Sequence, residues 1–472
     1  MNNFEQKVGY GFGDFSSSMF WKIFTYFLPI FYTNVFGLTL ADAGMLMLIT
    51  KMWDAVSDPM MGIIADRTNT RWGKYRPYLL WIALPFAIAG VLLFTTPPVD
   101  YTGKLIWAYT TYILMMTVYT AINVPYGAML GVVSGDSDER TIFSSFRMFF
   151  AYAGSFLAVA IFEPMRDMFA KMNGVANSEN DPTSWQMAMI VIAVLCLIFF
   201  LFCFAMTREN VKIKENTQKR DIIKDFKIVI SNRPWWILLG VSIAIILFNT
   251  VRGATAAYYF ADYLGDDNFM GEFFGRSLLL SCTIFLAIGE VANMVGVALA
   301  PALSKALGKK NAYIAAMLMI GILSIPFYWL TDGSLVNYWL IILFQVLISI
   351  CAGVTLPLVW SMVADVADHS ECTHKRSTVG LIFSSSSMAQ KIGGAIGSAM
   401  VLWLLDAYGY QAPKEGVSIA QTATAINGLR SLMSWIPGLA SILGALIMFY
   451  YPLNEKIMAQ VRTELETKHK EE

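Results

Sequence analysis

The sequence predicts an all-α polytopic membrane protein, and three observations carry this prediction. Hydrophobic residues make up 56% of the 472 residues, charged residues make up 14%, and the mean hydropathy is +0.54. The apolar residues gather in runs of membrane-spanning length, and most basic residues fall on one side of those runs. Because average soluble domains carry roughly 25% charged residues, this composition excludes a disordered chain and argues against a soluble globular one. Acidic and basic residues number 34 each, so no basic excess indicates a nucleic-acid partner.

Twelve apolar runs approach the length of about 20 residues that a bilayer-spanning helix needs. In the first half they are Tyr10–Phe36, Ala41–Ala65, Tyr78–Thr96, Leu105–Val133, Ile142–Met165 and Trp185–Met206. In the second half they are Trp235–Leu264, Ser277–Leu303, Ala312–Leu330, Tyr338–Ala364, Thr378–Leu405 and Leu429–Tyr451. The chain therefore divides into a six-helix bundle (1–207), a polar central loop (208–234), a second six-helix bundle (235–452) and a charged tail (453–472).

The placement of positive charge indicates the orientation of these spans. If both termini and the central loop lie in the cytoplasm, the cytoplasmic segments hold 23 Lys and Arg and the opposite loops hold five. Cytoplasmic loops of membrane proteins carry such an excess. We therefore expect a multi-pass protein of the cell (inner) membrane with both termini in the cytoplasm. We also expect the monomer to be the functional unit.

Two acidic residues in the second run form the first candidate site. Asp54 and Asp58 are four residues apart, so their carboxylates lie on one helix face. Like charges one turn apart in a low dielectric repel each other, and a bound cation or a shared proton would relieve the repulsion. Hard cations prefer carboxylate and hydroxyl oxygens, and Ser57 and Thr120 are the further oxygen donors. The alternative is a structural ion network that Lys51 completes.

Polar residues in the first run suit a sugar-binding cavity. Asp14, Ser18 and Lys22 recur every four residues and form one polar stripe, with Trp21 beside it. Aromatic faces stack on sugar rings, and sugar hydroxyls need polar partners. The alternative is a structural pair between Asp14 and Lys22.

Later runs supply the remaining candidates for substrate binding. They are Tyr119, Asn123, Tyr126, Arg147, Arg252, Trp360, Ser387 and Lys391. A charge within a span is costly unless it is paired, so we expect Arg147 and Lys391 to partner the acids of the first two runs. The serine run 384–387 is equally compatible with binding and with helix packing. In the packing case Gly393, Gly394 and Gly397 would supply the close-contact surface.

The loop after the second run carries a short motif. Its pattern, GxxxDR…RxGK, is formed by Gly62, Asp66, Arg67, Arg71, Gly73 and Lys74. Together with two sets of six spans, this pattern resembles the major facilitator superfamily. The resemblance implies a substrate site between two halves near the midplane, and an Asp66–Arg contact that holds the cytoplasmic side shut.

Longer motifs resemble the glycoside–pentoside–hexuronide:cation symporter family, which includes the melibiose permeases. They are KMWDAVSDPMMG (51–62), DRTNTRWGKYRP (66–77), YTAINVPYGAM (119–129), VRGATAAYYFADYLG (251–265) and MVADVADHSECTHKRSTVG (362–380). The resemblance implies sodium-, lithium- or proton-coupled uptake of a sugar, with the cation at Asp54, Asp58 and Thr120. In this resemblance Arg147 takes the position of the family's arginine on the fifth span, and Lys391 takes that of its lysine on the eleventh span. It further implies cytoplasmic gating against basic residues of the other half, for which the candidates are Asp365, Asp368, Glu371 and Arg376.

The sequence also departs from the melibiose permeases. Ser18 and Asn123 stand where those proteins carry sugar-binding acids, and Gly127 replaces an aromatic residue. Galactoside specificity is therefore not carried over. The NVPYGA and RGxxxxYY patterns resemble the xyloside and glycoside branch instead, which implies a pentoside, a glycoside or a small oligosaccharide as substrate. Alternatives are a carrier of an amphiphile such as a lysophospholipid, and a non-transporting sugar sensor.

Enzymatic and metal chemistry find little support. The spans carry no HExxH motif, GxSxG motif or Cys/His pair, so we do not expect an enzyme. His369, Cys372 and His374 fall in a polar segment expected to be a loop, but they lack the usual spacing of zinc ligands. We therefore expect no cofactor and no metal beyond the coupling cation.

Overall fold

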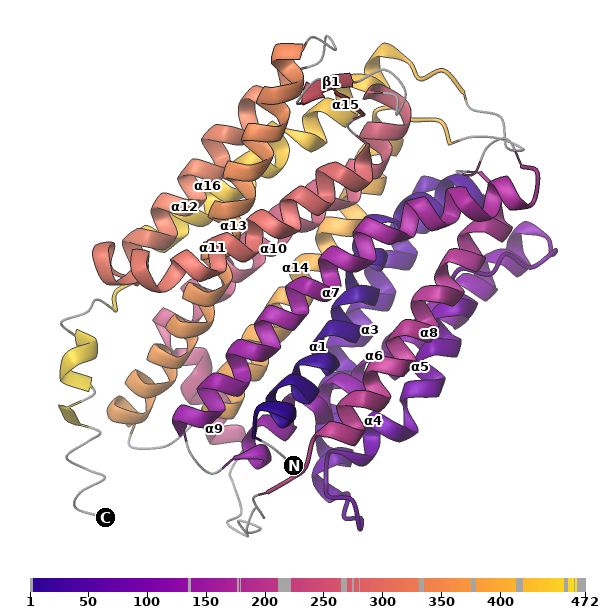
Figure 1. Ribbon diagram of the computed structural model, residues 1–472. Helices are drawn as coiled ribbons and strands as arrows, with labels where there is room; N and C mark the ends of the chain where they lie inside the picture. Colours follow the sequence, from indigo (N-terminus) through magenta and orange to yellow (C-terminus); the bar gives the residue numbers. More distant parts are fainter. Residues whose placement is uncertain are drawn as a thin grey trace.

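The computed structural model shows two groups of long helices packed side by side (Figure 1). The first group, drawn in indigo to magenta, holds the helices up to α8, and the second, drawn in rose to yellow, holds α10 to α16. The structure describes residues 3–134, 137–175, 178, 180–210, 222–264, 270–273, 276–279, 281–330, 335–374, 379–412, 419–453, 457–461 and 463–464.

The first group and the short helix that follows it have these bounds: α1 Asn3–Tyr26, α2 Leu28–Ile30, η1 Phe31–Val35, α3 Leu40–Arg67, α4 Pro77–Trp81, α5 Ala83–Leu93, α6 Tyr101–Val133, α7 Ser137–Met172, α8 Pro182–Met206 and α9 Ile222–Ser231. The second group comprises α10 Arg233–Tyr259, η2 Phe260–Leu264, β1 Met270–Phe273, β2 Arg276–Leu279, α11 Cys282–Leu307, α12 Lys309–Ser324, η3 Ile325–Trp329, α13 Leu335–His374, α14 Val379–Ala407, α15 Ala423–Met433 and α16 Trp435–Phe449.

Helices of membrane-spanning length account for most of the described chain. Nine of the described helices are long and apolar enough to cross a membrane. The other three expected spans correspond to α1, α3 and α4–α5. The helices α1 and α3 carry charges near their middles, and α4–α5 is interrupted at Ile82. The predicted all-α fold with twelve spans therefore agrees with the structure.

Three local predictions were wrong. Residues 277–279 begin no helix, because they pair with β1 in an antiparallel hairpin, and α11 starts only after Ser281 caps it. The last span starts at Ala423 rather than Leu429 and is broken at Ser434. Cys372 lies in the helical end of α13, not in a loop.

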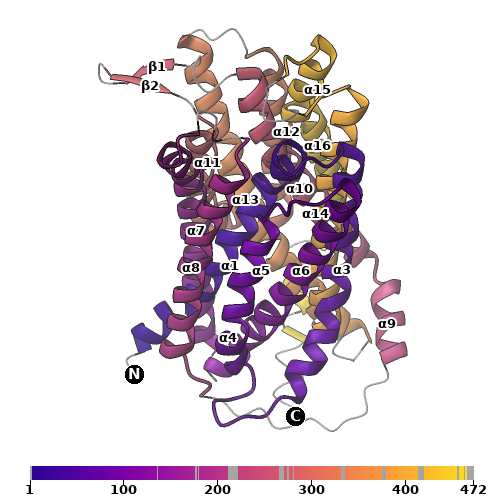
Figure 2. The ribbon, with the colours of Figure 1, turned by 90° about the vertical axis from the view of Figure 1, so that its right-hand side faces the viewer.

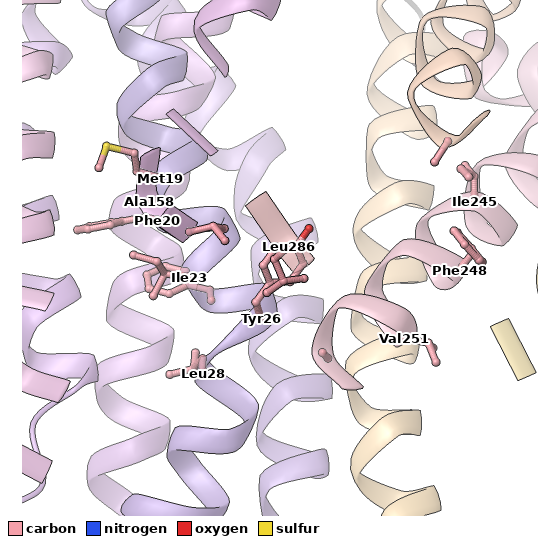
Figure 3. Packing of buried hydrophobic residues seen from close by; sticks show 14 of the residues in the cluster. Met19, Phe20, Ile23, Tyr26, Leu28, Ala158, Ile245, Phe248, Val251 and Leu286 are labelled. Atoms are coloured by element: carbon pink, nitrogen blue, oxygen red, sulfur yellow. The ribbon is translucent and has the colours of Figure 1, made fainter. Parts of the chain in front are cut away.

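The two faces of the bundle differ in what they carry. Figure 2 shows α1 beginning at one face, called here the terminal face, and the β1–β2 hairpin and α15 at the opposite face. Side chains capping helix starts help to fix the ends: Thr39, Asp100, Asp181 and Ser281 each accept a hydrogen bond from a backbone N–H in the first turn that follows. Within the first group, Met19, Phe20 and Ile23 of α1 pack in the buried core, on the side where Ala158 of α7 lies (Figure 3).

Small residues allow the closest helix contacts. A Cβ atom on Gly296 of α11 would collide with the backbone of Ile350, and one on Gly353 of α13 would collide with the backbone of Asn293. Without a hydrophobic driving force between spans, such close backbone approach is a main source of helix association. Gly393 and Gly397 of α14 likewise leave room for α10, as the packing interpretation of this segment requires.

We expect Gly296→Ala to destabilise the protein by about 1–3 kcal/mol, because overpacking forces backbone shifts. The helix propensity gain of up to about 1 kcal/mol from Gly to Ala acts in the opposite direction. Gly127→Ala is the matched control, since that helical glycine has no neighbour within 4 Å of an added Cβ. Thermal unfolding in detergent measures the stability of the Gly296→Ala and Gly127→Ala variants. Equal stability of the two variants would contradict the close-contact assignment.

Candidate functional site

The paired carboxylates of α3 meet a lysine from the other half of the molecule. Lys391 Nζ on α14 lies 3.0 Å from Asp54 Oδ2 and 2.5 Å from Asp58 Oδ2. The Asp54 side chain is 1% exposed and that of Asp58 is 26% exposed. The expected pairing of Lys391 with the acids of α3 is therefore present, and it joins the two groups of helices.

Two hydroxyl groups complete a set of oxygens around the carboxylates. Thr120 Oγ1 on α6 lies 2.9 Å from Asp54 Oδ1 and 3.0 Å from Asp58 Oδ1. Ser57 Oγ lies 3.0 Å from Thr120 Oγ1 and donates to the backbone oxygen of Asp54 at 3.0 Å. One hydroxyl proton of Thr120 can satisfy only one carboxylate at a time. The oxygens are of the type that a hard monovalent cation prefers.

Lys51 does not take the place that the alternative network gave it. Its ammonium donates to Ser398 Oγ at 2.5 Å and to the Gly394 backbone oxygen at 3.3 Å, both on α14. It also lies 5.9 Å from the centre of the Trp21 ring. The long lysine side chain reaches past its own helix face, and Lys391 supplies the ammonium that bridges the carboxylates.

Candidate sugar-binding residues of the first half gather around α1. Arg147 on α7 forms an ion pair with Asp14, so the alternative Asp14–Lys22 pair was wrong. Trp21 packs against Tyr119 with ring centres 5.6 Å apart. Ser17 Oγ donates to Asn123 Oδ1 at 2.6 Å, which places the amide of α6 beside the same stripe.

Two other members of the first-half set differ in environment. Tyr126 is fully buried and stacks on Tyr10 with ring centres 4.8 Å apart, while Arg147 lies 5.1 Å from its ring centre. Tyr126 thus supports the position of Arg147 rather than facing an open space. Ser18 is partly exposed on α1.

Of the second-half candidates, Lys391 reaches the first half at Asp54 and Asp58, whereas Arg252 and Trp360 contact residues of their own half. Arg252 donates to the backbone oxygen of Met433 at 2.8 Å and to Gln345 Oε1 at 2.9 Å. Trp360 stacks on Phe383 within the second half. The hydroxyls of Ser384, Ser385 and Ser386 bond to backbone oxygens of their own helix, as expected for packing, and Ser387 is partly exposed.

Sequence analysis missed an acid in this region. Glu290 on α11 is 1% exposed, and its Oε1 lies 2.6 Å from Lys22 Nζ and 2.7 Å from Tyr26 Oη. A carboxylate within the apolar run Ser277–Leu303 is the same signal that identified Asp54. Lys22 is therefore paired across the two halves, with an acid far away in the sequence.

The loop after α3 is held by an acid in the segment that follows α8. The carboxylate of Glu209 accepts hydrogen bonds from the backbone N–H groups of Lys74, Tyr75 and Arg76 at 2.7–2.8 Å. Arg67 is exposed at the end of α3, and Arg71 stacks on its neighbour Trp72 at 4.6 Å. The Asp66 side chain lies outside the described residues.

The acidic run at the end of α13 is partly described. Lys309 Nζ lies 2.5 Å from Asp365 Oδ2, and both residues belong to the second half. This pair does not provide the expected link to the other half. Asp368 and Glu371 lie on the same helix, and Arg376 is outside the described residues. Among the described residues, no group of three or more His, Cys, Asp or Glu side chains could hold a metal ion.

Further contacts join the halves toward the opposite face. Thr33 and Tyr258 share a hydrogen bond of 2.8 Å, and Asn34 Nδ2 donates to Tyr410 Oη at 3.3 Å. Thr283 donates to Glu163. With the Lys22–Glu290 and Lys391–Asp pairs, these contacts form a polar interface between the halves from mid-membrane to the opposite face.

Comparisons with known proteins agree on one family. A family model described as "MFS/sugar transport protein" matches residues 9–455. The inner membrane symporter YicJ of Escherichia coli is 30% identical, with 98% of this chain and 94% of that protein covered. The putative glycoside/cation symporter YagG of E. coli is 33% identical, with 92% of this chain and 88% of that protein covered. The isoprimeverose transporter of Lactiplantibacillus pentosus is 29% identical, with 99% of this chain and 92% of that protein covered.

Solved structures share the fold at low sequence identity. A bacterial homologue of the drug peptide transporters PepT1 and PepT2 superimposes with a TM-score of 0.69 at 13% identity, covering 98% of this chain and all of that one. The nucleoside transporter NupG gives a TM-score of 0.62 at 14% identity, covering 96% of this chain and all of that one.

The twelve-span bundle and its buried ion pairs between halves define a membrane transporter of the major facilitator type, not an enzyme. Within that class, the chain belongs to the MFS/sugar transport protein family, in its glycoside–pentoside–hexuronide:cation symporter branch.

Proposed function

We propose that the protein imports a neutral pentoside or glycoside together with one monovalent cation, which binds at Asp54 and Asp58. The oxygen cluster of Asp54, Asp58, Thr120 and Ser57 under the Lys391 ammonium carries this proposal. The two six-helix halves (1–207 and 235–452) alternate access to a substrate bound beside Asp14, Trp21 and Arg147. Both termini face the cytoplasm, and the monomer is the working unit.

The charges around the site explain why cation and sugar move together. Asp54 and Asp58 carry two negative charges, and Lys391 is the ammonium that bridges them when no cation is bound. A cation between the carboxylates displaces the Lys391 ammonium, and an unpaired buried charge is costly. Hydroxyl oxygens of a bound sugar then accept hydrogen bonds from Lys391. Loading by cation alone leaves the Lys391 ammonium without a partner, whereas it pairs with the carboxylates in the empty carrier and bonds to sugar hydroxyls in the fully loaded one.

The membrane potential supplies enough energy for accumulation. One cation crossing about 100 mV gains about 2.3 kcal/mol. At about 1.4 kcal/mol per tenfold, this supports roughly fiftyfold accumulation of a neutral substrate before any cation gradient is counted. The names of two relatives, a glycoside/cation symporter and an isoprimeverose transporter, favour a glycoside as the substrate.

Uptake into proteoliposomes tests the proposal. Labelled isoprimeverose, xylose and melibiose are each offered under an inward Na⁺, Li⁺ or H⁺ gradient, with the interior negative. We expect one cation gradient to drive accumulation of isoprimeverose or xylose at least tenfold above equilibrium, and melibiose to be a poor substrate. Uptake that stops at equilibrium under all three gradients would contradict cation coupling.

A further inference from the structure

Glu290 has one carboxylate oxygen that its neighbours leave free. Lys22 and Tyr26 both bond to Oε1, whereas Oε2 is buried and makes no hydrogen bond to the described residues. A buried acceptor without a donor is costly, and such groups in native proteins need an explanation. The free oxygen of Glu290 therefore indicates a place where a ligand or water donates a hydrogen bond.

Glu290 lines a cavity whose other polar walls suit hydroxyl groups. The walls include Asn249 and Arg252 of α10, Asn293 of α11, and Gln345 and Ser349 of α13. Side-chain amides offer both a donor and an acceptor, and a carboxylate accepts from more than one donor. Neighbouring hydroxyls on a sugar ring present the same mixture. Phe248 and Phe285 add apolar faces at the edges.

The cavity lies at the contact between the halves. Tyr26 of α1 forms its wall on the first half, and Gly253 of α10 leaves the space that the Tyr26 ring fills. Figure 3 shows Tyr26 beside Leu286 of α11, with Phe248 on the neighbouring α10, and all three line this cavity. In this conformation the cavity measures about 50 Å³, which is room for a few waters at about 10–15 Å³ each. Because one wall belongs to the other half, separation of the halves at this point enlarges it.

The cavity is too far from Asp14 for one sugar ring to reach both. Asp14, Lys22 and Tyr26 lie on one face of α1, with Lys22 eight residues and Tyr26 twelve residues after Asp14. Glu290 bonds to Lys22, and at about 1.5 Å per residue the positions of Asp14 and Lys22 along α1 are about 12 Å apart. A first ring beside Asp14, Arg147 and Trp21 thus leaves Glu290 free for a second ring.

We infer that the Glu290 cavity is a second glycosyl subsite, in which hydroxyls of the distal ring of a two-ring glycoside donate to the Glu290 carboxylate. In the conformation described here, the Lys22 ammonium and the Tyr26 hydroxyl are the donors on Oε1. When the halves part, the ring hydroxyls bond to Glu290, Asn249 and Asn293. This inference rests on the proposed function and adds a preference for glycosides of two rings over monosaccharides.

Glu290→Gln tests the subsite in the full-length protein in nanodiscs. Equilibrium binding of isoprimeverose and of xylose is measured at saturating concentrations of the coupling cation. Hydrogen bonds to a charged group contribute enough that we expect a ten- to hundredfold loss of affinity for isoprimeverose. The affinity for xylose changes less than about threefold. Asn249→Ala, which leaves the Lys22–Glu290 pair intact, lowers the affinity for isoprimeverose about three- to tenfold.

Thr283→Val is the matched control, because it removes another hydrogen bond between α11 and the first half without lining the cavity. Its affinities for both sugars should equal those of the wild type. Equal losses for both sugars in Glu290→Gln, or no loss for isoprimeverose in either cavity variant, would overturn the subsite. If the wild type binds neither sugar, the proposed function fails as well, so the two failures are distinguishable.

Discussion

Replacement of Asp54 or Asp58 by Asn is expected to abolish cation-driven accumulation, leaving only equilibration of the substrate across the membrane. Each change removes one of the two charges that attract the cation, and Lys391 then neutralises the carboxylate that remains. The remaining carboxylate and the Lys391 ammonium have no net charge between them, so the pair does not attract a cation. Accumulation falls from the roughly fiftyfold level that a potential of about 100 mV supports to about onefold.

Asp42→Asn is the matched control for this experiment. Asp42 lies on the same helix, α3, but near its opposite-face end, where it accepts hydrogen bonds from Thr39 and Tyr101. Accumulation of labelled substrate in proteoliposomes is measured for all three variants, together with facilitated equilibration to verify folding. If Asp58→Asn retained full accumulation, the cation would have to bind elsewhere.

The clustering of the Asp54 and Asp58 carboxylates was predictable because its signal is local. Asp54 and Asp58 are one turn apart in an apolar run, so helix geometry alone places their carboxylates together. The partners Arg147 and Lys391 followed from the small number of charges within spans, since each must find an opposite charge. For α14 the recurrence of small residues left packing and binding equally open, and the close approach of Gly393 and Gly397 to α10 supports packing.

Other features depend on tertiary contacts that spacing does not report. Lys51 and Lys22 both lie near acids of their own helices, yet their long side chains reach α14 and Glu290 of the other half. The residues of the Lys22–Glu290 pair come from α1 and α11, and no motif connects them. The hairpin at 270–279 was missed because its second strand reads as the start of an apolar span.

Lys391→Gln is expected to separate exchange from net uptake. Without the ammonium, Asp54 and Asp58 lack their cationic partner whenever the coupling ion leaves, and an unpaired buried charge costs about 3–5 kcal/mol. The empty carrier then returns at least tenfold more slowly, so net uptake falls by that factor. Exchange of external for internal substrate proceeds without an empty step, and a glutamine amide still bonds to sugar hydroxyls. Counterflow in proteoliposomes should therefore stay within about threefold of the wild type.

Lys51→Gln distinguishes this effect from a general loss of contact between α3 and α14. Lys51 bonds to Ser398 and Gly394 across the same helix pair, but its replacement leaves the carboxylate–ammonium bridge intact. Net uptake by this variant should fall less than about threefold. Equal losses in Lys51→Gln and Lys391→Gln, or loss of counterflow in Lys391→Gln, would show that Lys391 acts by joining the helices. The expected difference between the variants follows from charge alone: only Lys391 stands in for the coupling cation.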